Sequence, residues 1–270
     1  MKLILVSIFL FAAVAGAAVL PRADSHGEVV SSKEAQAYVV DNVSLANVSA
    51  KSYVIFDAET GEILLSKNAE EVLPIASVTK LFTAAALLDS EIIDTEILVT
   101  NEDVAAEGRA GKLEAGHMYQ LRELLFPLLL ESSNDAAEAM QRLLPKKEWF
   151  NVKLKDASGL SDENTASARN LADEIGKLYR EKKYLFDITK LPQYVGEETG
   201  WVNNSPIRDL EGYLGGKHGY TVAANRTLVA FFSEKSLNGR ELGYVLLGSD
   251  NIREDTLNLR ETVANSVHLE

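Results

Sequence analysis

The chain has 270 residues, of which 46% are hydrophobic and 25% charged, a composition typical of a folded protein with a sizeable core. Lys and Arg number 27 against 40 Asp and Glu, so the net charge of −13 argues against a nucleic-acid partner and against docking on an anionic membrane surface. The absence of cysteine excludes disulfides, thiolate metal sites and cysteine nucleophiles, and is compatible with an oxidising compartment.

The N-terminus predicts export. Residues 3–20 form an uncharged, mostly apolar run that follows Lys2 and approaches the length needed to span a bilayer. A small-residue cleavage site is present at 15–17, so segment 1–20 is either a signal peptide or an N-terminal membrane anchor. We therefore expect an extracytoplasmic protein, in the periplasm or on the outer face of the cytoplasmic membrane. Residues 21–50 are predicted to be a polar tether with a short helix around 34–42.

A β-hairpin is predicted next. Residues 52–57 and 62–66 are rich in Ile, Val, Leu and Tyr and are joined by the turn-like sequence at 58–61. The following segment, 74–89, contains strong helix formers and is apolar on all sides, which predicts a buried helix with Ser77 in its first turn.

The middle of the chain, from about 91 to 180, is predicted to be mostly helical. Its clearest helical segments are 121–130 and 136–144, and Pro127 predicts a bend in the first of them.

The last third returns to strands. Residues 212–222, 226–233 and 240–247 carry β-branched and aromatic side chains, with a hairpin turn at Asn238-Gly239, and a helix is predicted over 254–267. Strands at both ends of the chain around a helical middle indicate one sheet with a helical insertion.

Ser77 and Lys80 form the single Ser-x-x-Lys sequence of the chain. On a helix, residues i and i+3 are neighbours, so the Lys amine can reach the Ser hydroxyl. A Ser hydroxyl needs a neighbouring base to become a good nucleophile. Burial and a second cation lower the pKa of a Lys and free its amine. The ordinary alternative is a solvated Lys on a helix surface, and the apolar surroundings count against it.

Two more short patterns carry polar groups suited to catalysis. Ser132 and Asn134 offer a hydroxyl and an amide for proton transfer and substrate binding. Taken alone, however, Ser132-Ser133-Asn134 is more typical of a helix N-cap. Lys217-His218-Gly219 is the single Lys-x-Gly and lies in a predicted strand. A glycine there lets a ligand approach the backbone, and a strand edge with a Lys can bind an extended peptide and its carboxylate.

In this order, Ser-x-x-Lys, Ser-x-Asn and Lys-x-Gly resemble the three signatures of penicillin-binding serine transferases and serine β-lactamases. Residues 74–81, 131–137, 158–160, 165–172 and 216–221 are similar to the D-alanyl-D-alanine carboxypeptidases of low molecular mass. The resemblance runs from about 52 to 247.

This resemblance implies an α/β fold of the α+β type, with a DD-peptidase-like antiparallel sheet flanked by helices. The catalytic domain would span 51–270, with the mostly helical subdomain at about 91–180.

The resemblance also implies roles for individual residues. Ser77 would attack the carbonyl between two D-alanines, Lys80 would take its proton, and Ser132 would continue the proton relay. The oxyanion would bind to the backbone amides of Ser77 and Tyr220. Substrate-binding residues would be Asn134, Lys217, His218, Gly219, Tyr220 and Thr221. Neither a metal nor an organic cofactor is expected. The expected partners are peptidoglycan stem peptides and, as covalent inhibitors, β-lactams.

The sequence departs from the family pattern in three places. His218 replaces the usual Thr of the third motif, so an imidazole of pKa near 6.5 would face the substrate carboxylate or else pack on the sheet. Ser133 replaces a frequent Gly. The chain also leaves no room for the extra C-terminal β-domain and amphipathic anchor of many carboxypeptidases, so any membrane attachment is expected to be through the N-terminal segment.

Several functions fit these residues. The first is D-Ala-D-Ala carboxypeptidase activity on stem peptides, and the second is D-alanyl-D-alanine endopeptidase cleavage of cross-links. A β-lactamase is disfavoured because no loop that would supply a deacylating Glu is evident in the sequence. The alternative from another class is a wall-binding protein whose catalytic site has decayed, with His218 as the sign of decay.

Overall fold

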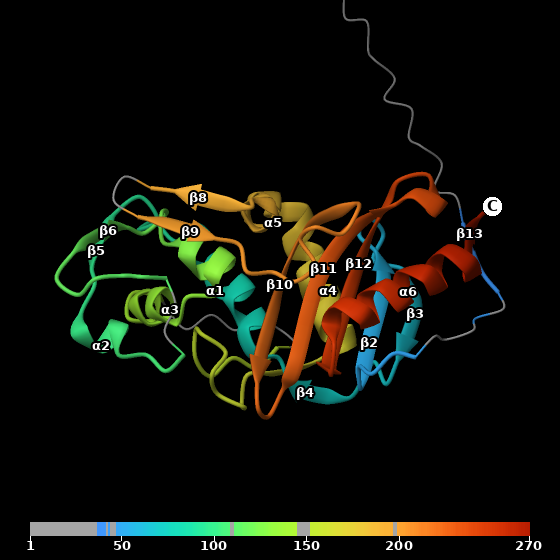
Figure 1. Cartoon of the computed structure of the whole chain (residues 1–270), viewed down its shortest axis with the longest axis horizontal. Helices are drawn as coiled ribbons and strands as arrows, with labels where there is room; N and C mark the ends of the chain where they lie inside the picture. The colour runs from blue at the N-terminus through green and yellow to red at the C-terminus, as the bar shows by residue number, and fades with distance from the viewer. Residues whose placement is uncertain (1–36, 42, 44–46, 109–110, 145–151, 197–198) are drawn as a thin grey trace, which may run out of the picture. The chain divides into compact units, whose positions relative to one another are not determined.

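A five-stranded antiparallel sheet organises the fold, with strand order β10-β11-β12-β2-β3 (Figure 1). It therefore joins the first strands of the chain to the last, as the sequence predicted. Each of its five strands lies within a residue or two of the predicted range. Their bounds are β2 (Ser52–Asp57), β3 (Ile63–Lys67), β10 (Tyr213–Thr221), β11 (Asn225–Glu234) and β12 (Arg240–Ser249).

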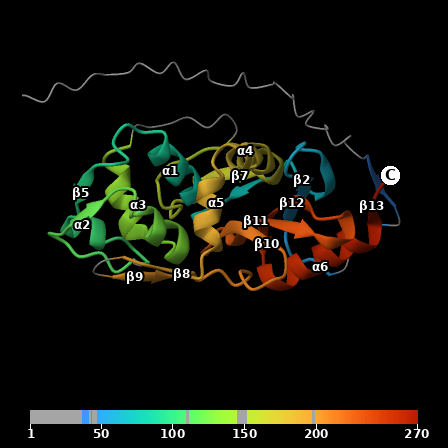
Figure 2. The same ribbon diagram turned by 90° about the horizontal axis from the view of Figure 1, so that it is seen from above.

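Helices cover both faces of this sheet, because successive side chains of the central strands alternate between two apolar clusters. Val229 and Phe231 of β11 belong to one cluster, and Leu228 and Phe232 belong to the other. The turned view shows α6 on one side of the sheet and α4 with α5 on the opposite side (Figure 2). The bounds of these helices are α4 (Ala168–Glu181), α5 (Lys183–Lys190) and α6 (Ile252–Ser266).

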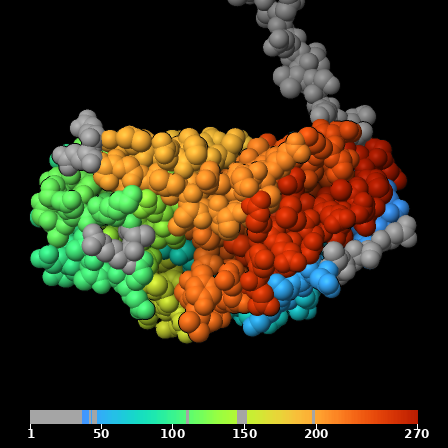
Figure 3. Space-filling model, in the orientation of Figure 1, coloured from blue at the N-terminus to red at the C-terminus, as the bar shows by residue number. Residues whose placement is uncertain are grey.

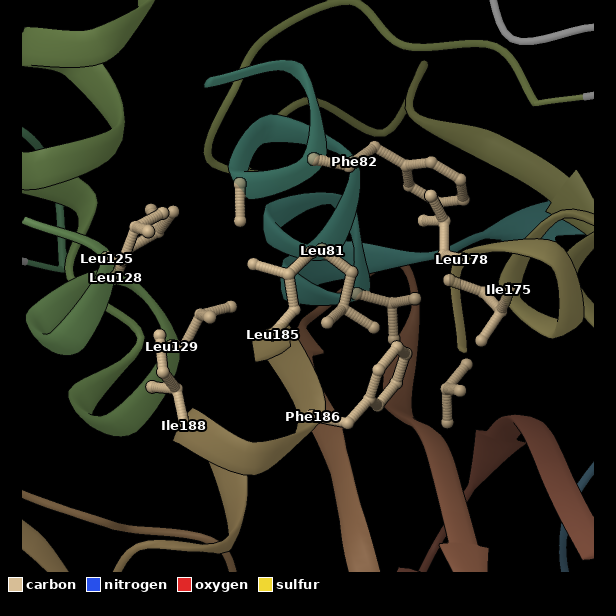
Figure 4. Packing of buried hydrophobic residues seen from close by; sticks show 14 of the residues in the cluster. Leu81, Phe82, Leu125, Leu128, Leu129, Ile175, Leu178, Leu185, Phe186 and Ile188 are labelled. Carbon is tan, nitrogen blue, oxygen red and sulfur yellow. The ribbon is translucent and has the colours of Figure 1, made fainter. Parts of the chain in front are cut away.

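The larger cluster surrounds α1 (Thr79–Leu88), the buried helix that the sequence predicted. Leu81 of this helix lies among side chains of α4, α5 and the segment around Leu128, as the close view shows (Figure 4). Because α1 is enclosed by apolar neighbours on several sides, its position is fixed, and the preceding residues 76–78 pack against β10 and β11.

The predicted helix at 74–89 starts later than expected. Pro74 ends a short strand, β4 (Val72–Pro74), which pairs with β7 (Thr165–Ser167). A single 3₁₀ turn, η1 (Ala76–Val78), then leads into α1. Ser77 therefore lies just before the α-helix rather than inside its first turn.

The middle of the chain is less helical than predicted. It contains the strand pair β5 (Glu96–Leu98) and β6 (Met118–Gln120), the short helix α2 (Asn101–Val104) and helix α3 (Asn134–Gln141). A bend was predicted at Pro127. In the structure, Pro127 is instead the first residue of a π-helical turn, η2 (Pro127–Glu131). Proline suits the first position because its missing N–H would have no partner inside the helix.

Two further strand pairs were not predicted. The strand β1 (Tyr38–Val40) pairs with β13 (Val267–Leu269), so the prediction of a helix is wrong for residues 38–40. The strand β8 (Gln193–Val195) pairs with β9 (Gly200–Val202). A 3₁₀ turn, η3 (Lys235–Leu237), precedes the predicted turn at Asn238.

The structure is a computed structural model that describes residues 37–41, 43, 47–108, 111–144, 152–196 and 199–270. The predicted signal peptide or anchor at 1–20 and most of the tether lie outside these residues. Within the described part, none of the helices has the length and apolarity required to cross a bilayer.

Candidate active site

Ser77 and Lys80 meet as the sequence predicted. Ser77 lies in η1 and is half-buried, while Lys80 lies in the first turn of α1 and is fully buried. The Lys80 Nζ atom is 3.0 Å from the Ser77 Oγ atom. A Lys amine at this distance can accept the proton of the Ser hydroxyl directly.

The surroundings of Lys80 determine how its amine is oriented. Its Nζ donates to Asn134 Oδ1 at 2.7 Å and to the Ser158 carbonyl oxygen at 2.6 Å. The Asn134 amide nitrogen donates to the carbonyl oxygens of Glu107 and Gly108, which leaves Oδ1 facing Lys80. These two acceptors occupy both N–H bonds of a neutral amine. The remaining lone pair then points to Ser77.

Burial also prepares Lys80 chemically. Desolvation in the apolar core lowers the pKa of Lys80 from 10.5 to about 7, while the charges of Asp156 and Glu138 oppose this shift. A substantial fraction of the amine is therefore unprotonated near neutral pH, which is the form that a general base requires.

Ser132 and Lys217 form a second polar pair beside the first. Ser132 follows η2 in a left-handed backbone conformation, with φ 63°. The Lys217 Nζ atom donates to Ser132 Oγ at 3.0 Å and to the His218 carbonyl oxygen at 2.6 Å. Lys217 is 2% exposed, and burial, together with the charge of Lys80, holds its pKa well below the usual value.

The helix N-cap predicted within Ser132-Ser133-Asn134 is present in the structure. Ser133 is the N-cap of α3, and its Oγ accepts from the Ala136 N–H. Ser132 and Asn134, on either side of the cap, reach Lys217 and Lys80 respectively. One short turn therefore supplies side chains to both lysines.

Gly219 lets strand β10 lie close to the nucleophile turn. A Cβ at Gly219 would lie 2.5 Å from the Ser77 backbone nitrogen and 3.0 Å from the Ala76 Cβ. No larger residue fits without displacing η1. The close approach leaves the backbone of Ser77 next to that of β10, as an oxyanion site formed by Ser77 and Tyr220 would require.

The three remaining predicted residues lie on β10 on either side of Gly219. His218 alternates to the opposite sheet face from Lys217, and Tyr220 is 60% exposed beside Arg226. The Thr221 Oγ1 atom accepts from the Ala224 N–H and closes the β10–β11 turn.

The structure corrects the expectation that the His218 imidazole has a pKa near 6.5. Burial, with the neighbouring charges of Lys217 and Lys80, lowers the pKa of the His218 imidazole to about 3. The ring is therefore neutral at physiological pH, and the expected gain of positive charge near pH 6.5 does not occur.

The loop at 156–164 contributes to the site in a way that the sequence did not reveal. Ser158-Gly159-Leu160 resembles a family stretch to which the sequence assigned no role, yet the Ser158 carbonyl contacts Lys80. Asp156, which was not predicted as a site residue, accepts several hydrogen bonds from this loop. The signal in the sequence was an Asp two residues before a Ser-Gly pair, which is typical of an Asx turn.

The two pairs, Ser77 with Lys80 and Ser132 with Lys217, lie at the junction between the five-stranded sheet and the middle part of the chain, which contains α1, η2 and α3. In the space-filling view, teal atoms, the colour of η1 and α1, lie at the bottom of a hollow between orange atoms of β10–β11 and green atoms of the helical part (Figure 3).

Comparison with known proteins places this site in context. Residues 39–148 match the family model described as D-alanyl-D-alanine carboxypeptidase. The D-alanyl-D-alanine carboxypeptidase DacB2 of Mycobacterium tuberculosis is 25% identical over 209 residues, which are 70% of this chain and 72% of that protein. A D-alanyl-D-alanine endopeptidase of Pseudomonas aeruginosa is 31% identical over 141 residues, 46% of each chain. The chain thus matches less than half the length of that endopeptidase.

Solved structures share the fold. The crystal structure of a D-alanyl-D-alanine carboxypeptidase from Mycobacterium tuberculosis H37Rv superposes with a TM-score of 0.74 at 22% identity, covering 83% of this chain and 94% of that one. The Streptomyces K15 DD-transpeptidase gives a TM-score of 0.72 at 19% identity, covering 82% and 98%. The sequence is accordingly similar to those of D-alanyl-D-alanine carboxypeptidases, and the chain has the fold of the penicillin-binding DD-peptidases.

Proposed function

We propose that the chain is a serine-type D-Ala-D-Ala carboxypeptidase that acts on peptidoglycan stem peptides through an acyl-enzyme on Ser77. The observation that carries this proposal is the buried Lys80 amine, whose two N–H bonds are held by Asn134 Oδ1 and the Ser158 carbonyl beside the Ser77 hydroxyl. A decayed wall-binding protein would have no need to keep a Lys desolvated in this geometry. Because such peptides lie outside the membrane, the proposal agrees with the predicted export of the chain.

In the first step, the Ser77 Oγ atom bonds to the carbonyl carbon of the penultimate D-Ala as its proton passes to Lys80 Nζ. The oxyanion that forms binds to the backbone amides of Ser77 and Tyr220, which typically lowers the barrier by a few kcal/mol. The C–N bond then breaks, and the proton from Lys80 reaches the leaving D-Ala nitrogen with Ser132 as the carrier.

In the second step, water attacks the acyl-enzyme carbonyl and gives a proton to the same base. The bond between Ser77 Oγ and the acyl carbon then breaks as Lys80 returns that proton to Ser77 Oγ, which releases the shortened peptide and restores the starting state. Lys217 supplies charge for the terminal carboxylate of the substrate, since an anion entering beside this buried amine favours its protonated form. Asn134 has two roles: it orients Lys80 and it positions the peptide.

Endopeptidase activity on cross-links is the second candidate, because three of the related proteins carry that name, from Pseudomonas aeruginosa, Haemophilus influenzae and Escherichia coli. Both reactions use the same acyl-enzyme and differ in the amine that leaves. Purified pentapeptide muropeptides and cross-linked dimers, digested in parallel and resolved by mass, separate the two: release of free D-Ala identifies the carboxypeptidase, and conversion of dimers to monomers identifies the endopeptidase.

The proposal is tested by intact-mass spectrometry after incubation with benzylpenicillin. A mass increase of one penicilloyl group that maps to Ser77 and is lost in Ser77→Ala is the expected result. Failure of the wild type to form any adduct would favour the non-catalytic wall-binding protein. Rapid turnover of nitrocefin would instead indicate a β-lactamase.

A further inference from the structure

Asp156 organises the loop that touches both the base and the nucleophile turn. We infer that Asp156 is a positioning residue: its carboxylate holds the Ser158 carbonyl against Lys80, so that the lone pair of the amine faces Ser77. This inference rests on the proposed function and concerns the same site. Asp156 acts through Ser158 and does not itself touch the reacting atoms.

In this loop the carboxylate of Asp156 accepts the backbone hydrogen bonds that a helix or strand would otherwise accept. Its Oδ1 accepts from the backbone N–H of Ser158 at 2.9 Å and of Gly159 at 2.5 Å, and its Oδ2 accepts from the Ser161 N–H at 2.7 Å. The side chain of Asn164 donates to the same Oδ1 atom at 3.0 Å. With these groups gathered around one carboxylate, the Ser158 carbonyl turns outward and meets Lys80 Nζ at 2.6 Å.

The same loop also supports the turn that carries the nucleophile. The backbone oxygen of Asn164 accepts from the Ile75 N–H at 2.9 Å, just before η1. Gly159 packs against the Ala76 carbonyl so closely that a side chain there would collide with it. Asp156 therefore fixes a single rigid piece that fits against η1 and Lys80 together.

A Lys base needs a fixed acceptor such as the Ser158 carbonyl because of the chemistry of its amine. A neutral amine can rotate about its terminal bond and present either an N–H or its lone pair to Ser77. Asn134 Oδ1 takes one N–H, and only a second acceptor can hold the other. The Ser158 carbonyl is that acceptor. If it moves, the amine can rotate, and the alignment of Ser77 with the lone pair is lost.

Charge adds a second, separable effect. Burial alone would raise the pKa of Asp156, but the N–H groups of Ser161 and Gly159 outweigh it and hold the pKa below its usual range, so the group stays ionised. Its negative charge stabilises the protonated form of Lys80.

Other charged and titratable groups also face Lys80. Glu138 of α3 acts on Lys80 in the same direction as Asp156. On β10, the charge of Lys80 lowers the pKa of Lys217 and of His218. Removing only the charge of Asp156 should therefore lower the pKa of Lys80.

The experiment measures the acylation rate constant with a fluorescent penicillin from pH 5 to 9. In Asp156→Asn, two changes are expected. The plateau falls about tenfold or more because the amide cannot accept from all three backbone N–H groups. The midpoint of the acidic limb moves down by about half to one pH unit because a negative charge near the amine is gone. A variant that merely loosened the fold would lower the plateau without moving the midpoint.

Two matched variants complete the design. In Asp156→Glu the charge remains but the carboxylate is displaced by one methylene, so the midpoint stays at the wild-type value and the plateau falls. Glu163→Gln changes an exposed carboxylate of the same loop that pairs with Lys153 and Lys155. It should leave both midpoint and plateau unchanged.

The outcomes are decisive in either direction. A wild-type plateau in Asp156→Asn, or a lowered plateau with an unmoved midpoint, overturns the inference. If circular dichroism shows that Asp156→Asn is unfolded, Asp156→Glu decides, and a wild-type plateau there overturns it. Failure of the proposed function is distinguishable from all of these, because the wild-type protein itself would then form no penicilloyl adduct.

Discussion

Gly159 lies directly against Ala76: a Cβ on Gly159 would come within 2.0 Å of the Ala76 carbonyl oxygen. Ala76 has a φ of 48°, in the left-handed region that is costly for a residue with a side chain. The residue after Ala76 is Ser77. A glycine from a distant loop therefore packs on the strained turn that presents the nucleophile.

Replacement of Gly159 by Ala should reduce acylation by at least about a hundredfold, because the loop must move away from η1 to make room for the methyl group. Gly116→Ala is a matched control, since Gly116 has φ 87° against 84° for Gly159 but has no atom within 4 Å of the place that a Cβ would take. The control carries the backbone strain alone, about 1 kcal/mol. Equal acylation rates in the two variants would show that the contact with Ala76 is unimportant.

The acylation rate should fall as the pH falls through about 7. The pKa of Lys80 is lowered by burial to about 7, so the free amine is lost by protonation below that pH. Lys80→Ala should reduce the rate by roughly a hundred- to ten-thousand-fold at pH 8 and remain folded. Stopped-flow acylation at constant ionic strength measures both effects. A wild-type rate that stays level from pH 8 to pH 5 would contradict Lys80 as the base.

The same group makes stability depend on pH. Between about pH 7 and 10.5, the unfolded chain holds a proton on Lys80 that the folded protein lacks, so the free energy of unfolding rises with pH in this window. The contribution of one such group has a slope of at most about 1.4 kcal/mol per pH unit. Urea unfolding at pH 7.5 and 9.5 should show a smaller rise for Lys80→Met than for the wild type. Identical rises in both proteins would be the contrary result.

Ser132 allows its hydroxyl to be separated from its backbone conformation. Its φ of 63° suits glycine better than alanine, so Ser132→Gly should be more stable than Ser132→Ala by about 1 kcal/mol. Both variants lose the hydroxyl that accepts from Lys217 and should lose most of their acylation activity. Thermal melts with parallel penicillin labelling test this pair. A fully active Ser132→Gly would remove Ser132 from the proton relay.

His218→Thr should leave the pH dependence of KM between about pH 5.5 and 7.5 unchanged. The imidazole has a pKa of about 3 because of burial and the neighbouring lysines, so it does not titrate in this range. Steady-state kinetics on a D-Ala-D-Ala peptide with a free carboxylate would check this. A pH-dependent component of KM that is present in the wild type and vanishes in the variant would mean that the ring gains a proton when substrate binds.

The sequence by itself determined the elements whose pattern is local. The strands around Val54, Val229 and Val245 could be predicted because β-branched and aromatic residues follow one another between clear turns. The pairing of Ser77 with Lys80 could also be predicted, since it depends only on the geometry of one helical turn. The order of three short motifs was enough to indicate the family.

Tertiary structure decided what depends on contacts between distant segments. The lowered pKa of Lys80 arises from its enclosure by the core, and the orientation of its amine depends on Asn134 and Ser158, 54 and 78 residues away. Nothing in the local sequence shows that the imidazole of His218 is kept neutral. Pairings such as β1 with β13 likewise depend on which edges meet in space. Desolvation and long-range hydrogen bonding are properties of the packed molecule, so they cannot be predicted from the local sequence and are determined by the folded structure.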